Sequence, residues 1–184
     1  MSATLTLLRH PRPCVADGIC YGRTDCAADP HHEQAVLSEL LKALPPQRVL
    51  TSPALRCRVV ATRLCDRWQR PCEMEPRLLE MDFGRWEGLS WDAVPRADLN
   101  AWARRPEDYA PGGGESLRDV AQRVRDWAGE AAAAHTDVLA VTHGGVIRLL
   151  MAWSRGEPLT SALSIPAPGF GQVLRLPLGC FAAS

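Results

Sequence analysis

TLTLLRHPRP, residues 4–13, begins as an apolar segment and ends abruptly in charged side chains and prolines. Its first residues have the apolar and β-branched character of a buried strand, which closes on Arg9 and His10. Pro11 then prevents regular structure, because proline has no backbone N–H and favours an extended conformation at the residue before it. His10 is therefore expected to project from the end of the strand while the chain turns away.

The rest of the chain alternates between strand and helix patterns. Helices are predicted over 33–44, 52–68, 115–135 and 146–153, and strands over 48–51, at the start of 137–145, over 172–176, and before Glu80. This alternation predicts an α/β fold with three layers, in which a mainly parallel mixed sheet carries helices on both faces. In such sheets, ligands bind outside the carboxyl ends of the strands.

Two of the predicted helices have clear apolar faces and start signals. The first is expected to bury Val36, Leu37, Leu40, Leu41 and Leu44, and the one over 115–135 to bury Leu117, Val120, Val124, Trp127 and Ala131. Ser52 is expected to cap the helix that Pro53 opens, and Ser116 with Asp119 resembles a capping box.

The length of 184 residues fits a single domain over 1–184. Residues 84–115 differ from the rest, because three of the six tryptophans lie there among prolines and glycines. We interpret this stretch as an irregular, lid-like excursion from the alternating pattern.

Composition excludes several classes of protein. Lysine and arginine (21 together) balance aspartate and glutamate (21 together), so no overall field favours nucleic acid or membranes. No apolar run reaches the roughly 20 residues that span a bilayer, and the N-terminus lacks a signal-peptide pattern. The seven cysteines form no C-x-x-C pair, which favours reduced thiols and a cytoplasmic location.

Two of the five histidines stand out by position. His10 and His143 each follow a predicted strand, so both are expected at the ligand-binding edge of the sheet. His31 and His32 are expected in a polar loop, and His135 at a helix end, where a cation is favoured in any case. A single histidine at a strand end would most simply be structural, but two in matching places indicate a site.

Arginines near these histidines indicate an anion. Arg9 precedes His10, and Arg56 lies in the first turn of the helix after the second strand; two guanidinium groups suit phosphate oxygens. Surface salt bridges are the alternative explanation for either arginine alone. The amides at the Gly144 helix start could add an anion contact.

Neither histidine has carboxylates or thiolates at metal-ligand spacing, so no metal and no other cofactor is predicted. Without a metal to activate water, a neutral imidazole can attack phosphorus directly and form a phosphohistidine. An alkoxide leaving group also needs a proton. LLEMDFGRWEG (78–88) supplies Glu80 as a general acid, with Asp82 and Glu87 as competitors.

These residues form a pattern that resembles the histidine phosphatase superfamily, also called phosphoglycerate mutase-like. The matching segments are LLRH (7–10), CYGRTD (20–25), TSPALRCRVVAT (51–62), LLEMDFGRWEG (78–88), GGESL (113–117) and VTHGGVIR (141–148). The resemblance implies a phosphoglycerate mutase-like fold, with His10 as nucleophile, Arg9 and Arg56 as phosphate ligands, and Glu80 as proton donor. It also implies that His143 completes the pocket.

The chain departs from the family pattern at two positions. Pro11 replaces the usual glycine after Arg-His, and Ala16 stands near the place of an asparagine that contacts phosphate in many relatives. Arg12 could compensate from the same loop. The resemblance also implies that Thr24 lies in a loop close to the phosphate.

The expected function is a metal-independent phosphomonoesterase that acts on a small phosphorylated metabolite. CYGRTD and the 78–88 segment look most similar to the α-ribazole phosphatases of cobalamin assembly, which makes α-ribazole 5′-phosphate the first substrate to consider. A phosphoglycerate mutase-type phosphotransferase, a protein phosphohistidine phosphatase, and a phosphate-ligand-binding protein without turnover are the alternatives. No nucleic-acid or membrane partner is expected, and the oligomeric state cannot be predicted.

Overall fold

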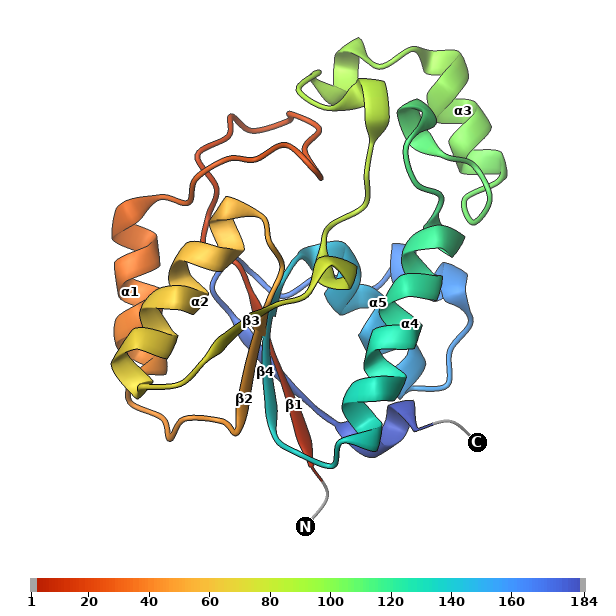
Figure 1. Ribbon diagram of the computed structural model, residues 1–184. Helices are drawn as coiled ribbons and strands as arrows, with labels where there is room; N and C mark the ends of the chain where they lie inside the picture. Colours follow the sequence, from red (N-terminus) through yellow and green to blue (C-terminus); the bar gives the residue numbers. More distant parts are fainter. Residues whose placement is uncertain (1–2, 183–184) are drawn as a thin grey trace.

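A computed structural model describes residues 3–182 of the chain (Figure 1). Its single sheet has the strand order β3-β2-β4-β1-β5. The strands are β1 (Thr4–Arg9), β2 (Arg48–Thr51), β3 (Cys72–Met74), β4 (Val138–Thr142) and β5 (Val173–Pro177). The first four pair in parallel and β5 pairs antiparallel to β1, which confirms the predicted mainly parallel mixed sheet.

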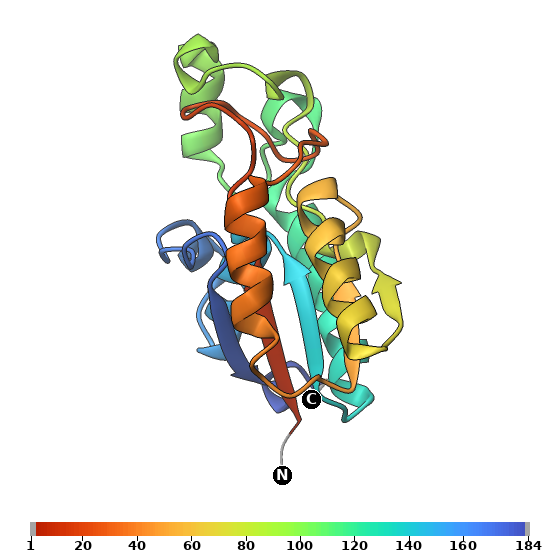
Figure 2. The ribbon, with the colours of Figure 1, turned by 90° about the vertical axis from the view of Figure 1, so that its left-hand side faces the viewer.

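Helices cover both faces of the sheet, which confirms the predicted three-layer α/β fold (Figures 1 and 2). One face is covered by α1 (Pro30–Leu40) and α2 (Leu55–Trp68), and the other by α4 (Leu117–Ala133) and α5 (Gly144–Ser154). The shortest α-helix, α3 (Arg96–Arg104), lies above the upper edge of the sheet in Figure 1. No helix in residues 3–182 is both long enough and apolar enough to cross a membrane.

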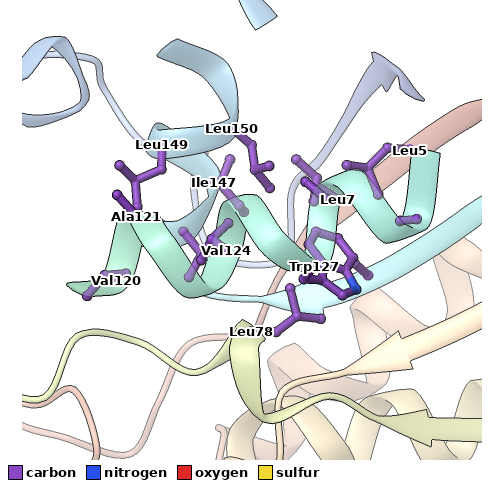
Figure 3. Packing of buried hydrophobic residues seen from close by; sticks show 14 of the residues in the cluster. Leu5, Leu7, Leu78, Val120, Ala121, Val124, Trp127, Ile147, Leu149 and Leu150 are labelled. Carbon is purple, nitrogen blue, oxygen red and sulfur yellow. The ribbon is translucent and has the colours of Figure 1, made fainter. Parts of the chain in front are cut away.

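The larger core cluster lies between α4, α5 and the sheet (Figure 3). Val124 and Trp127 of α4 are buried against Ile147 and Leu150 of α5 and against the side chains of β1. Each large apolar side chain buried in this way contributes about 1.5–3 kcal/mol to stability. The predicted capping box is present, because Ser116 and Asp119 each bond the other's backbone N–H, and the predicted inward face of α4 is buried throughout.

The first two helices differ from the predictions at their ends. Asp29 accepts a hydrogen bond from the His32 amide and Pro30 opens α1, so the helix starts earlier than predicted and His31 and His32 lie in its first turn rather than in a loop. The helix ends at Leu40, before the two prolines, and Leu44 is 92% exposed rather than buried.

Helix α2 begins at Leu55 with Ala54 as its N-cap and with no side-chain cap. Ser52 is therefore not the capping residue that the sequence predicted, because it lies two residues before the N-cap; its hydroxyl accepts from the Ala54 amide across 3.4 Å and also lies 2.8 Å from His143 Nε2.

Residues 84–115 consist of α3 and short 3₁₀ turns over Gly84–Trp86, Trp91–Ala93 and Pro111–Gly113. They pack around a small core centred on the buried Trp86, to which the buried Cys20 also contributes. Position 112 requires glycine for two reasons. Its φ of 61° lies in the left-handed region, and a Cβ there would stand 2.0 Å from the carbonyl oxygen of Phe83. That these residues act as a lid stays a prediction.

Candidate active site

A cavity of about 410 Å³ opens at the carboxyl ends of the central strands. Arg9 pairs with Thr142 in the register of β1 and β4, so the next residues, His10 and His143, also lie side by side. Their ring centroids are 5.2 Å apart, with the planes at 62°. The two histidines that the sequence analysis singled out therefore come together at the expected edge of the sheet.

The orientation of His10 follows from one hydrogen bond. Its Nδ1 lies 2.7 Å from the carbonyl oxygen of Pro11, which can only accept, so Nδ1 carries the proton and Nε2 holds a free lone pair. Burial, together with the positive charges of Arg56 and Arg9, lowers the pKa of this imidazole to about 3. Proline retains the carbonyl group that this contact requires, so Pro11 does not disturb it.

His143 lies fully buried behind His10 and does not line the cavity. Arg56 Nη2 donates to His143 Nδ1 across 3.2 Å, and because a guanidinium only donates, the His143 proton is on Nε2. That nitrogen donates to Ser52 Oγ across 2.8 Å. Burial, followed by the charge of Arg56, lowers the pKa of His143 well below its ordinary value.

Arg56 is completely buried and is held in place by backbone carbonyl groups. Its Nη1 donates to the carbonyl oxygen of Thr24 across 2.9 Å and its Nη2 to that of Gly22 across 2.7 Å, while its Nε has no hydrogen-bond partner among residues 3–182. The guanidinium therefore has a fixed orientation at the cavity wall.

Glu87 organises the loop that supplies these carbonyl groups. Its carboxylate accepts hydrogen bonds from the backbone amides of Gly22, Arg23, Thr24 and Phe83. Burial alone would raise the pKa of Glu87, but the hydrogen bonds from Thr24 and the amides keep it below its ordinary value. Glu87 thus fixes the loop through its backbone amides, and the carbonyl groups of the same loop fix the orientation of Arg56.

Thr24 lies in the loop that holds Arg56 at the cavity wall. Its hydroxyl donates to Glu87 and its side chain does not line the cavity, whereas its carbonyl group serves Arg56. The Thr24 hydroxyl does not reach the cavity, because the Glu87 carboxylate binds it, and the closeness of this loop to the phosphate stays a prediction.

Arg9 is fixed by the segment that precedes β5. Its Nη1 donates to the carbonyl oxygen of Pro168 across 2.7 Å, and its guanidinium carbon lies 4.0 Å from the ring centre of Phe170. Its Nε is buried and has no hydrogen-bond partner in the described part of the chain. Gly144 packs against this group, since a Cβ at position 144 would lie 3.3 Å from the guanidinium carbon. The predicted anion contact of Gly144 is not seen at the cavity wall, which Gly145 lines instead.

Among the three acidic candidates of the 78–88 segment, only Glu80 lines the cavity. Its Oε2 accepts from the Gly145 amide across 3.0 Å and its Oε1 from the Met81 amide across 3.1 Å. A Cβ at position 145 would stand 2.3 Å from Oε1, so this carboxyl group can approach α5 only because residue 145 is glycine. Asp82 instead bonds the Gly84 amide.

Arg12 and Ala16 lie outside the cavity. They line a neighbouring hollow of about 520 Å³. The side chains of Ile19, Tyr21 and Trp91 form a wall between this hollow and the cavity, because they line both. The exposed Arg12 therefore does not compensate for Ala16 within the cavity, as the sequence had suggested, because the loop carries it to the other side of this shared wall.

Sequence reasoning missed several cavity residues. Tyr21, Phe83, Trp91, Trp102 and Arg148 all line it. Arg148 ends the quoted VTHGGVIR segment, five residues beyond His143, so its place in that segment was a signal. Within the residues that the structure describes, the buried Nε atoms of Arg9, Arg56 and Arg148 all lack a hydrogen-bond partner. This arrangement suits an anion at one end of the cavity and an apolar or aromatic group at the other. Within residues 3–182, no cluster of three or more His, Cys, Asp or Glu side chains could hold a metal ion.

The buried histidines predict a pH dependence of folding. His10 titrates near 6.5 in an unfolded chain but near 3 in the folded protein. Between these values the unfolded chain binds a proton that the folded protein excludes. The free energy of unfolding should therefore decrease as the pH falls below about 6.5, by up to about 1.4 kcal/mol per pH unit for each such histidine.

Urea unfolding at pH values between 7 and 5 measures this decrease, and His10→Gln should make it shallower. An unchanged slope in the variant would contradict the burial of a neutral imidazole at position 10.

Comparison with known proteins gives a consistent result. A family model described as the histidine phosphatase superfamily (branch 1) matches residues 5–173. The chain is similar to the glucosyl-3-phosphoglycerate phosphatase of Mycolicibacterium vanbaalenii, with 35% identity over 173 residues that cover 84% of this chain and 75% of that protein. It is also similar to the adenosylcobalamin/alpha-ribazole phosphatase of Salmonella typhimurium, with 29% identity over 152 residues, 80% of this chain and 71% of that protein.

Among solved structures, the native mycobacterial glucosyl-3-phosphoglycerate phosphatase superimposes with a TM-score of 0.82 at 26% identity. The superposition covers 95% of this chain and 90% of that one.

Proposed function

The chain belongs to the histidine phosphatase superfamily, and we propose that it hydrolyses small phosphate monoesters through a phosphohistidine formed at His10. The observation that carries this proposal is the free Nε2 lone pair of a buried, neutral imidazole that shares a cavity wall with two guanidinium groups. The two relatives described above are phosphatases, which supports hydrolysis of a phosphate ester as the class of reaction.

In the first step, His10 Nε2 attacks phosphorus and forms an N–P bond as the ester P–O bond breaks. Glu80 gives its proton to the departing alkoxide oxygen, which leaves as an alcohol. In the second step, Glu80 takes a proton from water, the oxygen of that water attacks phosphorus, and the N–P bond breaks. Inorganic phosphate leaves and His10 is neutral again.

The charge on the transferring phosphoryl group needs donors that are already in place. Arg9 and Arg56 fulfil this role, since each is fixed by backbone carbonyl groups and keeps an unpartnered Nε. His143 accepts a hydrogen bond from Arg56 and packs against His10, so it helps to fix the orientation of both side chains. We assign it a positioning role in this conformation.

The alcohol portion of the substrate is proposed to lie between the aromatic walls. Trp91 and Trp102 stack with their planes at 14°, and both line the cavity, as Phe83 and Tyr21 do. Such walls suit a planar ring or a sugar. α-Ribazole 5′-phosphate, expected from the sequence, and glucosyl-3-phosphoglycerate, the substrate class that a relative's name gives, are therefore the first esters to test.

A chromogenic aryl phosphate tests the proposal without knowledge of the natural ester. We expect the purified protein to release phosphate from it, and we expect excess EDTA to leave the rate unchanged, because the proposed nucleophile is an imidazole. Loss of activity in EDTA with recovery on adding a divalent cation would contradict the mechanism. Absence of turnover on aryl phosphate and on a panel of metabolite esters would instead favour a phosphate-binding protein.

A further inference from the structure

A turn before β5 holds the ring of Phe170 against two of the residues assigned above to phosphate transfer. The Gly171 amide donates to the carbonyl oxygens of Arg9 and His10, across 3.1 and 3.2 Å, and the Arg9 amide donates to the carbonyl oxygen of Gln172 across 3.1 Å. These backbone hydrogen bonds fix the turn beside the end of β1, so the position of Phe170 is set by the same backbone that carries Arg9 and His10.

The Phe170 ring contacts both side chains. The guanidinium carbon of Arg9 lies over the ring, 4.0 Å from its centre, and the His10 ring centroid lies 5.4 Å from it with the planes at 38°. Phe170 itself lines the neighbouring hollow and not the cavity. It therefore lies behind the phosphate ligand and the nucleophile, and any effect on the reaction is exerted through those two side chains.

An aromatic ring suits this position better than an acidic side chain would. The face of the ring carries partial negative charge and attracts a cation, but it offers no oxygen that would neutralise the guanidinium. Arg9 forms no ion pair within residues 3–182. A carboxylate in the place of the ring would compete with phosphate for the guanidinium, whereas the ring holds it and leaves its charge available.

We propose that Phe170 is a positioning residue for phosphate transfer, whose ring face orients the Arg9 guanidinium for the phosphoryl group. The carbonyl oxygen of Pro168, which accepts from Arg9 Nη1 across 2.7 Å, is the second fixed contact of the same guanidinium. This inference rests on the proposed phosphatase function and adds a residue to it.

Two substitutions at position 170 separate the aromatic face from the apolar volume. Phe170→Leu keeps an apolar side chain but removes the face, so kcat/KM for an aryl phosphate should fall by about 3- to 30-fold. Phe170→Tyr keeps the face, and its hydroxyl group is expected to enter the neighbouring hollow that Phe170 lines, so kcat/KM should stay within about twofold of the wild-type value.

Phe181→Leu is the matched control for the loss of a ring. Phe181 packs against the larger core cluster and does not line the cavity, so this variant should also stay within about twofold of the wild type. Circular dichroism checks that each variant is folded. Should Phe170→Leu not fold, Phe170→Met removes the same aromatic face and provides the comparison with Phe170→Tyr.

A double-mutant cycle tests whether the ring acts through Arg9. Arg9→Met removes the charge and keeps an apolar stem. In that background Phe170→Leu should change kcat/KM by less than about twofold, because no cation is left for the ring to orient. Calorimetric titration with inorganic phosphate gives a second readout that needs no turnover: its Kd should rise by about 3- to 30-fold in Phe170→Leu and change little in Phe170→Tyr.

The outcomes distinguish this inference from the function on which it rests. Equal losses in Phe170→Leu and Phe170→Tyr, wild-type values in both, or a full loss from Phe170→Leu in the Arg9→Met background would overturn the role of the ring face and leave the phosphatase function standing. A wild-type protein that binds inorganic phosphate but hydrolyses no ester would overturn the proposed function, and the phosphate affinities of the variants would then decide whether the ring orients Arg9.

Discussion

His10→Ala is expected to lower kcat for aryl phosphate hydrolysis by about 10⁴-fold or more, which is the scale seen when a covalent nucleophile is removed. The reason is geometric. The Nδ1–H bond to the Pro11 carbonyl oxygen aims a free Nε2 lone pair away from the backbone, and no other cavity residue offers an unprotonated nucleophile of this kind within residues 3–182. Steady-state kinetics with a chromogenic ester measures the loss.

A matched control separates loss of the nucleophile from loss of the fold. His31→Ala removes an exposed histidine from the first turn of α1, outside the cavity, and is expected to leave kcat within about twofold. Circular dichroism should show that both variants are folded. Retention of more than a tenth of the wild-type kcat in folded His10→Ala would move the nucleophile to another residue.

Glu80→Gln is expected to have the second largest effect, and a selective one. The amide cannot donate a full proton to the leaving oxygen, so kcat for an alkyl phosphate should fall by about 10²- to 10⁴-fold. An aryl phosphate with an acidic leaving group needs little protonation, and its kcat should fall by less than about tenfold. The measured quantity is the ratio of the two losses.

Asp82→Asn serves as the control for this ratio. Asp82 lies two residues away but bonds the Gly84 amide and does not line the cavity, so the variant should not separate alkyl from aryl esters. Equal losses for both ester types in Glu80→Gln would remove the general-acid role and reduce Glu80 to an electrostatic or structural one.

The features that could be predicted from the sequence depend on local patterns. The continuous apolar run of β4 and the three- and four-residue spacing of α4 are local signals, and both elements lie where they were predicted. Because parallel strands end at one edge of a sheet, the meeting of His10 and His143 followed from two strand ends and a topological rule.

The features that could not be predicted depend on contacts between distant segments. Ser52 was interpreted as a helix cap, but it bonds His143, 91 residues away along the chain. Glu87 competed with Glu80 for one role and instead holds the amides of the loop around Thr24. Short polar side chains satisfy local and remote partners with similar energies, so spacing alone does not distinguish the two.

The position of the Arg12 side chain could not be predicted either. A loop between two prolines can direct a charged side chain to either side of a wall, and the sequence does not specify which. The structure places Arg12 in the neighbouring hollow, whereas Arg148, on a regular helix face, lies in the cavity itself.

The most direct measurement is the identification of the residue that carries phosphorus during turnover. The protein would be mixed with a ³²P-labelled ester, quenched with denaturant at alkaline pH to preserve N–P bonds, and mapped by peptide mass spectrometry. The account predicts one phosphoryl group, linked through nitrogen to the imidazole at position 10. A label on a different side chain, or no labelled protein at any time during turnover, would contradict it.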